Sequence, residues 1–439
     1  MKKILVLGAG LVSRPMVRYL LDTEGISVTV ATRTVEKAEK LVGGHPQGRA
    51  LQLLADDDEA LDRLVAEHDL AVSLLPYTLH VKVARCCLKH RRPMVTTSYV
   101  SDEMRSLDSE AKEAGVLLLN EIGVDPGIDH MSAMAIVEDI RKRGGKVVGF
   151  MSYCGGLPAP DANDNPLGYK FSWSPKGVVM AGRNEGRYLK DGAEVVVPGP
   201  ELFGHRWGLQ VKGVGDLEAY PNRNSLPYMK LYDLEGVNTM YRGTLRYPGW
   251  CATLKAMVDL GLLDDEPRND IADLTYAAWM RQYVPGDAGL REDVAAKLGI
   301  TADDTAVANL AWLGMFDDRL VGLESGSNLD ILAGLMLEKM SYKPGERDMI
   351  VLRHEFEAEM PDGAKEKLNS TLVCFGEPDG DTAMARTVSL PAAVATRLIV
   401  QGKLALTGVH IPVATEVYEP VLAELQELGI GFVEEKTRV

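Results

Sequence analysis

A glycine-rich turn near the start of the chain has the spacing of a nucleotide-phosphate site. The segment Gly8-Ala9-Gly10-Leu11-Val12-Ser13 is a G-x-G-x-x-G pattern whose third glycine is replaced by serine. Gly8 permits a tight turn, Gly10 lets a pyrophosphate approach the backbone, and a helix that begins there offers free N–H groups to the anion. A buried strand is predicted just before the turn, over residues 3–7, which is the context this pattern needs. We expect a dinucleotide site; the alternative is a glycine turn without a cofactor.

The end of the second predicted strand carries a cation where NAD enzymes carry a carboxylate. In those enzymes Asp or Glu accepts hydrogen bonds from the ribose hydroxyls. Here Thr32, Arg33 and Thr34 follow Ala31. A guanidinium with two flanking hydroxyls suits the additional phosphate of NADP, through bidentate charge-assisted hydrogen bonds. The pattern therefore favours NADP, and a solvated arginine at a helix start is the alternative.

Later strands of the same region also end in residues suited to a ligand site. Ligands of open α/β sheets bind beyond the carboxyl ends of the strands. Leu75 and Pro76 are expected to border the ribose and nicotinamide, and Thr97, Ser98 and Tyr99 offer hydroxyls to a polar substrate. Each of them is also an ordinary turn residue, which is the alternative interpretation.

These residues need a framework of alternating strands and helices, and the hydrophobic pattern predicts one. Strands are predicted at 3–7, 27–31, 70–76, 93–98 and 116–123. Helices are predicted at 11–21, 34–41, 59–67, 80–88 and 103–114. Such alternation indicates an α/β class with a Rossmann-type, doubly wound parallel sheet over residues 1–124.

The remainder of the chain has a different pattern and predicts further domains. The length of 439 residues exceeds what one core supports, about 250 residues. β-like runs punctuated by glycine and proline predict an α+β domain with a mixed sheet, over residues 125–246 and 343–404. Helical patterns predict a small helical subdomain over residues 247–342, and a C-terminal segment, about 405–439, is expected to pack back on the first domain.

The amino-acid composition argues against several classes of binding partner. The net charge of −15 argues against nucleic acid or an anionic membrane as a partner, so an anionic substrate would need a local group of arginines. The five cysteines have no metal-binding spacing, so neither a metal site nor a disulfide framework is predicted. Gly8 and Gly10 interrupt the first apolar stretch before it reaches the length of a signal segment or membrane span, and a cytoplasmic location is expected.

Seven ordered segments, spread over nearly the whole chain, resemble a known family: the NADP-dependent, glutamate-forming saccharopine dehydrogenases of lysine metabolism. They are SLLPYTLH at 73–80, VTTSYVS at 95–101, NEIGVDPGIDHM at 120–131, SYCGGLPAP at 152–160, DNPLGYKFSWSP at 164–175, AYPNRNS at 219–225 and RGTLRYPG at 242–249. The resemblance implies a homodimeric oxidoreductase that interconverts saccharopine with L-glutamate and L-2-aminoadipate 6-semialdehyde.

The resemblance also implies the ligand contacts. Cofactor contacts fall on Ala9, Gly10, Leu11, Val12, Thr32, Arg33, Thr34, Leu75, Thr97, Val124, Asp125, Pro126, Trp173 and Ser174. Substrate contacts fall on Ser98, Tyr99, Asp125, Arg223, Thr244, Leu245 and Arg246. One departure concerns Leu54 and Ala55, which stand where relatives often carry an aspartate near the adenine, so that contact is open.

The chemistry of saccharopine agrees with the roles that the resemblance implies for two arginines and one carboxylate. Saccharopine carries three carboxylates and a secondary amine, and the guanidinium groups of Arg223 and Arg246 are suited to carboxylates. Hydride would pass between the nicotinamide and the carbon of the C–N bond, by way of an imine, so the protein must align the two carbons. Asp125 is the candidate catalytic residue, as an electrostatic stabiliser or as a general base acting through water. Its alternative role is to cap the helix that begins at DPGIDH.

Other interpretations stay open at this point. His80 and His130 fall in or at the start of predicted helices and are expected to be structural. Another C–N dehydrogenase, of the carboxynorspermidine or opine type, would place acidic residues in the pocket in place of Arg223 and Arg246. A catalytically silent NADP-binding sensor would bind nucleotide without turnover.

Overall fold

A computed structural model describes residues 1–173 and 175–438 of the chain. The chain divides into two compact units. The first comprises residues 1–146, 360–364 and 370–435, and the second comprises residues 147–359, 365–369 and those from Lys436 onward.

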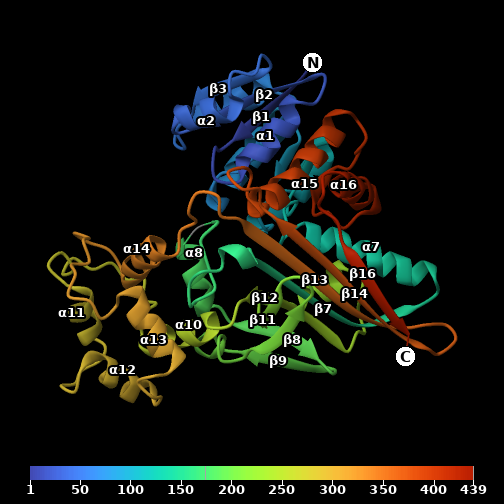
Figure 1. The fold of residues 1–439 in the computed structure, drawn as a ribbon. Helices are drawn as coiled ribbons and strands as arrows, with labels where there is room; N and C mark the ends of the chain where they lie inside the picture. Colours follow the sequence, from blue (N-terminus) through green and yellow to red (C-terminus); the bar gives the residue numbers. More distant parts are fainter. Residues whose placement is uncertain (174, 439) are drawn as a thin grey trace. The chain divides into compact units, whose positions relative to one another are not determined.

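The first unit is built on a seven-stranded parallel sheet (Figure 1). Its strand order is β15-β6-β5-β4-β1-β2-β3. The bounds are β1 Lys2–Leu7, β2 Ile26–Thr32, β3 Gly48–Gln52, β4 Leu70–Ser73, β5 Met94–Thr96, β6 Leu117–Leu119 and β15 Gly408–His410. The order reverses at β1, which pairs in parallel with both β2 and β4. The predicted Rossmann-type, doubly wound sheet is confirmed.

Helices connect successive strands of this sheet, as parallel pairing requires. They are α1 Ser13–Leu21, α2 Val35–Val42, α3 Asp58–Glu67, α4 His80–Lys89, α5 Asp102–Arg105 and α6 Asp108–Ala114. The single helix predicted over residues 103–114 is in fact two. The first of them is capped by Ser101, whose side chain accepts a hydrogen bond from the Met104 N–H at 3.1 Å.

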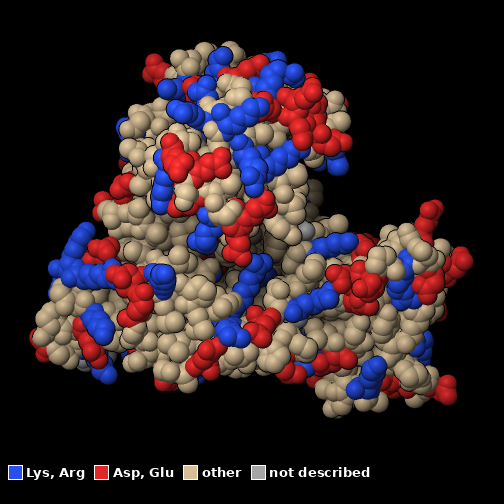
Figure 2. Space-filling view, turned by 180° about the vertical axis from the view of Figure 1, so that it is seen from behind, with Lys and Arg blue, Asp and Glu red and all other residues tan. Residues whose placement is uncertain are grey.

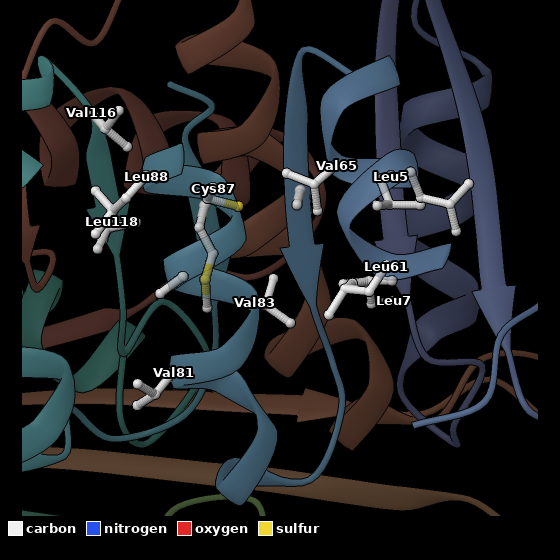
Figure 3. Close-up of a cluster of buried hydrophobic side chains, with 14 of the residues drawn as sticks. Leu5, Leu7, Leu61, Val65, Val81, Val83, Cys87, Leu88, Val116 and Leu118 are labelled. Carbon is white, nitrogen blue, oxygen red and sulfur yellow. The ribbon is translucent and has the colours of Figure 1, made fainter. Parts of the chain in front are cut away.

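Apolar side chains from the sheet and from helices α3, α4, α5 and α6 form one buried cluster in this unit (Figure 3). Leu5 and Leu7 of β1 pack with Leu61 of α3, and Val83 and Cys87 of α4 belong to the same cluster. Burial of each such leucine stabilises the fold by about 1.5–3 kcal/mol relative to an exposed side chain. This packing holds the carboxyl ends of β1 and β4 in place, where the glycine turn begins.

The predicted three-part division differs from the two observed units. Helices α7 Ile128–Lys142 and α15 Ala383–Val400 both belong to the first unit, although the sequence pattern placed them in the substrate domain. α15 packs against α1 and against α16 Thr415–Glu427, which itself packs against α7. α15 is long and apolar enough to cross a membrane, yet 72% of it is buried within the protein, as in a core helix. A separate helical subdomain stays a prediction.

The second sheet is mixed, as predicted. It runs β10-β11-β12-β7-β13-β14-β16, and β8 pairs with β12 and β9. The bounds are β7 Lys146–Pro158, β8 Gly186–Lys190, β9 Ala193–Val197, β10 Trp207–Val211, β11 Gly215–Pro221, β12 Thr239–Arg246, β13 Asp348–Glu359, β14 Lys365–Phe375 and β16 Val433–Arg438. β12 runs parallel to β7 and antiparallel to β11. Of the C-terminal segment, β15 and α16 lie in the first unit as predicted, whereas the last strand, β16, joins the second sheet.

Most of the helices of the second unit follow β12, as the pattern predicted. They are α8 Pro175–Met180, α9 Pro227–Leu231, α10 Trp250–Asp259, α11 Tyr276–Arg281, α12 Leu290–Leu298, α13 Thr305–Leu313 and α14 Asn328–Lys339. α10 begins directly after Gly249, whose φ of 102° suits glycine. The sharp change of direction brings Trp250 back toward the end of β12.

Candidate active site

The glycine turn lies at the carboxyl end of β1 in the first unit. Gly8 has a φ of 110°, and a Cβ there would lie 2.9 Å from the Leu74 carbonyl oxygen. A Cβ at Gly10 would meet no protein atom within 4 Å, so this side of the turn is open to a ligand. Ser13 is the first residue of α1, and its Oγ accepts a hydrogen bond from the Gly10 N–H at 3.0 Å. The serine at the third glycine position therefore holds the turn itself.

A pocket of about 350 Å³ opens beside this turn. The predicted cofactor residues in its wall are Gly8, Ala9, Gly10, Thr32, Arg33, Thr34, Leu75 and Pro76. Leu11, which follows them in the turn, is exposed. The structure thus brings together residues from the ends of three neighbouring strands, and their contact with NADP stays a prediction.

The wall of the pocket contains both apolar and cationic side chains. Leu53, Leu54 and Ala55 line it, together with Leu61 and Leu79. The departure at Leu54 and Ala55 therefore places apolar residues in the pocket wall, where relatives often carry an aspartate.

The same wall holds the predicted arginine and two lysines that sequence reasoning missed. Arg33 is exposed, and its carbonyl oxygen accepts a hydrogen bond from Gln52 Nε2 at 3.1 Å. Lys37 and Lys82 line the same pocket. On the face shown in Figure 2, acidic and basic side chains are interspersed. The three cations of the pocket wall, Arg33, Lys37 and Lys82, belong to a protein whose net charge is −15.

The predicted substrate residues of the first unit follow β5 and β6. The Tyr99 hydroxyl donates a hydrogen bond to Asp125 Oδ1 at 3.0 Å, and both residues are half-buried. Thr97 is also half-buried, Val124 is buried, and the Asp125–Pro126 peptide bond is cis. The N-cap of α7 is Gly127, and the Asp129 carboxylate accepts the Gly127 N–H at 2.6 Å. Asp125 is therefore not the N-cap residue of α7.

His80 holds the hydroxyl of Ser98. Its Nδ1 lies 2.8 Å from Ser73 Oγ and its Nε2 lies 2.8 Å from Ser98 Oγ. Burial lowers the pKa of the His80 imidazole to about 4, so the ring is neutral at pH 7. The expected structural role of His80 fits this geometry, and the chain of hydroxyl, imidazole and hydroxyl orients a predicted substrate contact.

Glu121 is a second positioning residue that the sequence analysis did not single out. It lies directly beyond β6, in the left-handed region with a φ of 56°. Its carboxylate accepts the Val100 N–H at 2.9 Å and contacts His130 Nε2 at 2.9 Å. These contacts tie the loop that carries Tyr99 to the start of α7. One sequence signal could have indicated Glu121: it is a charged residue that follows an apolar strand, in the segment NEIG.

The buried arginine of the second unit is Arg246. It is 5% exposed, and its guanidinium carbon lies 4.8 Å from the Tyr169 ring centre and 5.5 Å from that of Trp250. Nη1 donates to the Leu245 carbonyl oxygen at 2.7 Å. Among the described residues no carboxylate forms an ion pair with it; Glu218, opposite it on β11, bonds Arg206 at 3.0 Å.

An arginine buried in this way is costly unless an anion joins it. The guanidinium stays charged at any ordinary pH, and an unpaired buried charge destabilises the fold. The guanidinium lies over the two aromatic rings, and its Nε is buried without a hydrogen-bond partner among the residues that the structure describes. This arrangement suits a carboxylate.

The other predicted residues of the second unit have different positions. Thr244 lies on the same face of β12 as Arg246, since side chains alternate along a strand. Leu245 faces the opposite side and is fully buried in the core. Arg223 is exposed in a turn with a φ of 55°, two residues beyond the end of β11, whereas Arg246 is buried and pairs with Glu218 in the middle of that strand. The two predicted arginines therefore differ in burial, one at the surface and the other in the interior of this unit.

Trp173 connects to Arg246 through a tyrosine. The indole is 40% exposed, and its Nε1 donates a hydrogen bond to the Tyr169 hydroxyl at 3.2 Å. Tyr169 in turn stacks on the guanidinium of Arg246. The predicted contact at Ser174 lies outside the described residues. Within the described ranges, no group of three or more His, Cys, Asp and Glu side chains could hold a metal ion.

Two protein-family models match successive parts of the chain. The model of the saccharopine dehydrogenase NADP binding domain matches residues 4–119, and that of the saccharopine dehydrogenase C-terminal domain matches residues 123–430. The chain belongs to the saccharopine dehydrogenase family. The first of these matches contains the pocket beside the glycine turn, and the second contains Asp125, Trp173 and Arg246.

Two fungal relatives in this family match over nearly their full length. The NADP-dependent, L-glutamate-forming saccharopine dehydrogenase of Pyricularia oryzae is 41% identical, over 97% of each chain. That of Saccharomyces cerevisiae is 39% identical, over 99% of each chain. The apo structure of the L-Glu-forming yeast enzyme superposes with a TM-score of 0.92 at 38% identity, and the match covers 100% of both chains. Fold and family agree with the resemblance seen in the sequence.

Proposed function

We propose that this protein is an NADP-dependent saccharopine dehydrogenase that interconverts saccharopine with L-glutamate and L-2-aminoadipate 6-semialdehyde. The observation that carries the substrate assignment is the buried guanidinium of Arg246, which has no carboxylate partner among the described residues. Full-length relatives with this activity support the same conclusion. A carboxylate of the substrate would supply the missing counter-charge.

The residues at the cofactor pocket suit NADP. Free N–H groups at the start of α1 would hold the pyrophosphate, and Thr32, Arg33 and Thr34 would hold the additional phosphate. When bound, the nicotinamide supplies or accepts the hydride. The protein's own task is to orient the C–N bond and to manage a proton on its nitrogen.

The pair of Tyr99 and Asp125 is the candidate for that task. Asp125 is half-buried at the carboxyl edge of the sheet, where ligands of this fold bind. Its carboxylate would stabilise positive charge on the substrate nitrogen, as an electrostatic partner or as a base acting through water. The Tyr99 hydrogen bond orients the carboxylate, and His80 orients the neighbouring Ser98.

We also propose that the protein is a cytoplasmic homodimer. None of the five cysteines forms a disulfide in the structure, which is usual in a reducing compartment. The dimer is the state implied by the family resemblance. Light scattering on the purified protein would measure a mass of one or two chains and test this part separately.

A steady-state assay tests the activity. Saccharopine with NADP should produce NADPH absorbance at 340 nm in a reaction that needs both, and NAD should be the poorer cofactor. Carboxynorspermidine in place of saccharopine should give little turnover, since it carries one carboxylate in place of three and its polyamine chain adds positive charge. Nucleotide binding without turnover of saccharopine would support the silent sensor and overturn the proposal.

A further inference from the structure

We infer that Lys37 is a second determinant of cofactor specificity, which binds the 2′-phosphate of NADP together with Arg33. The inference rests on the proposed function, because it concerns the phosphate that distinguishes NADP from NAD. Lys37 lines the same pocket as Thr32, Arg33 and Thr34. It is the third residue of α2, in the turn that begins directly after Thr34, and its N–H donates to the Thr34 carbonyl oxygen at 3.1 Å.

The charge of the ligand calls for a second cation. A phosphate monoester carries about two negative charges near neutral pH, because its second pKa is about 6. Arg33 supplies one positive charge. Two lysines line the pocket with it, and Lys82 is already engaged: it donates to the Ala55 carbonyl oxygen at 2.7 Å and forms an ion pair with Asp58. Among the described residues Lys37 forms no ion pair, so it is the cation left for the phosphate.

The position of Lys37 in the first turn of α2 also favours a bound phosphate beside it. A cation in the first turn of a helix faces the positive end of the helix dipole, which is unfavourable unless an anion lies beside it. Lys40, in the last turn of α2, has the favourable position and does not line the pocket. Glu36 shares the first turn with Lys37 but also lies outside the pocket wall. Bound phosphate would therefore be attracted by Arg33, by Lys37 and by the helix end together.

Binding measurements separate this role from general electrostatics. We would compare wild type, Lys37→Ala and the matched control Lys40→Ala, both exposed positions of one helix where alanine is a good helix former. Calorimetry would give the Kd of NADPH, NADH, 2′,5′-ADP and 5′-AMP without turnover. Lys37→Ala should weaken NADPH and 2′,5′-ADP about tenfold, as expected for a charge-assisted hydrogen bond. NADH and 5′-AMP should change less than twofold, and Lys40→Ala should bind all four as wild type does.

Two results would overturn the inference. One is a Kd for NADPH in Lys37→Ala within twofold of wild type; the other is an equal loss for NADH, which would show a role unrelated to the 2′-phosphate. Lys37→Arg keeps the charge and should retain the preference for NADPH. If wild type itself bound NADPH no more tightly than NADH, the proposed function would fail, and the inference with it.

Discussion

The Tyr99 hydroxyl donates a hydrogen bond to Asp125 Oδ1 at 3.0 Å, and so joins the loop after β5 to the loop after β6. Both residues were predicted to contact substrate, but nothing in their sequence spacing showed that they contact each other. The bond makes Tyr99 a positioning residue for the candidate catalytic carboxylate.

Removal of this hydroxyl should slow the reaction more than it weakens the fold. In Tyr99→Phe we expect kcat to fall about tenfold, because a hydrogen bond to a charged group contributes about 1.5–3 kcal/mol. The matched control is Tyr418→Phe, which removes a hydroxyl bonded to Thr415 Oγ1 at 3.2 Å in α16. An equal loss of kcat in the two variants would contradict a specific role for Tyr99.

Arg246→Met should separate activity from stability. We expect kcat/KM for saccharopine to fall at least tenfold, because a charge-assisted contact contributes about 1.5 kcal/mol or more. The melting temperature should stay or rise, because the variant removes a buried charge that has no counter-ion among the described residues.

Substitution of Arg206 should have the opposite effect, a loss of stability with a smaller loss of activity. Arg206→Met leaves the half-buried carboxylate of Glu218 without its partner and should lower the melting temperature, with a smaller effect on kcat/KM. Kinetics and thermal unfolding of both variants check this. A marked loss of stability in Arg246→Met would mean that the arginine serves the fold.

The two glycines of the turn should respond differently to alanine. Gly10→Ala should fold normally, since its Cβ meets no protein atom, but should weaken NADPH binding at least tenfold because the methyl group takes the place of the pyrophosphate. Gly8→Ala forces a φ of 110° on alanine beside the Leu74 carbonyl, so it should also lower stability, by about 1–3 kcal/mol. Urea unfolding and fluorescence titration with NADPH measure the two effects. Wild-type affinity for NADPH in Gly10→Ala would show that the pyrophosphate does not bind at this turn.

Arg33→Asp should shift the cofactor preference from NADP toward NAD. A carboxylate at the end of β2 repels the 2′-phosphate and can accept hydrogen bonds from ribose hydroxyls. The ratio of kcat/KM with the two cofactors is the quantity to measure, and we expect it to change at least tenfold. An unchanged ratio would refute the role of Arg33.

Stability should fall as the solution is acidified, in part because of His80. Burial depresses the pKa of this imidazole from 6.5 to about 4 in the folded protein. The unfolded chain therefore binds the proton first, and the stability of the folded state falls between about pH 6.5 and pH 4. The contribution of this residue is about 3 kcal/mol, and burial lowers the pKa of His68 and His205 in the same direction.

The variant His80→Gln measures how much of this pH dependence of stability comes from His80. Urea unfolding from pH 7 to pH 4 should show a shallower dependence in His80→Gln than in wild type. Parallel curves for wild type and His80→Gln would contradict the expectation.

Local features could be predicted from the sequence because their geometry is set by neighbouring residues. The turn from Gly8 to Ser13 and the cation Arg33 each lie at a strand end, and alternating hydrophobic periods predict where the strands end. The resemblance over seven segments then named the family and the residues at both sites.

Contacts between distant segments could be decided only by the tertiary structure. The stacking of Arg246 on Tyr169 and Trp250, and the role of Glu121 beside His130, depend on which loops meet after folding. Lys37 looks like any exposed lysine of an amphipathic helix until the pocket wall is known. α15 is buried on most sides, so its apolar residues have no single face that would indicate its unit. The sequence by itself determined the order of the elements and the chemistry at their ends; packing decided which of those ends meet, because side chains far apart in the chain become neighbours only when the sheets and helices bury their apolar faces.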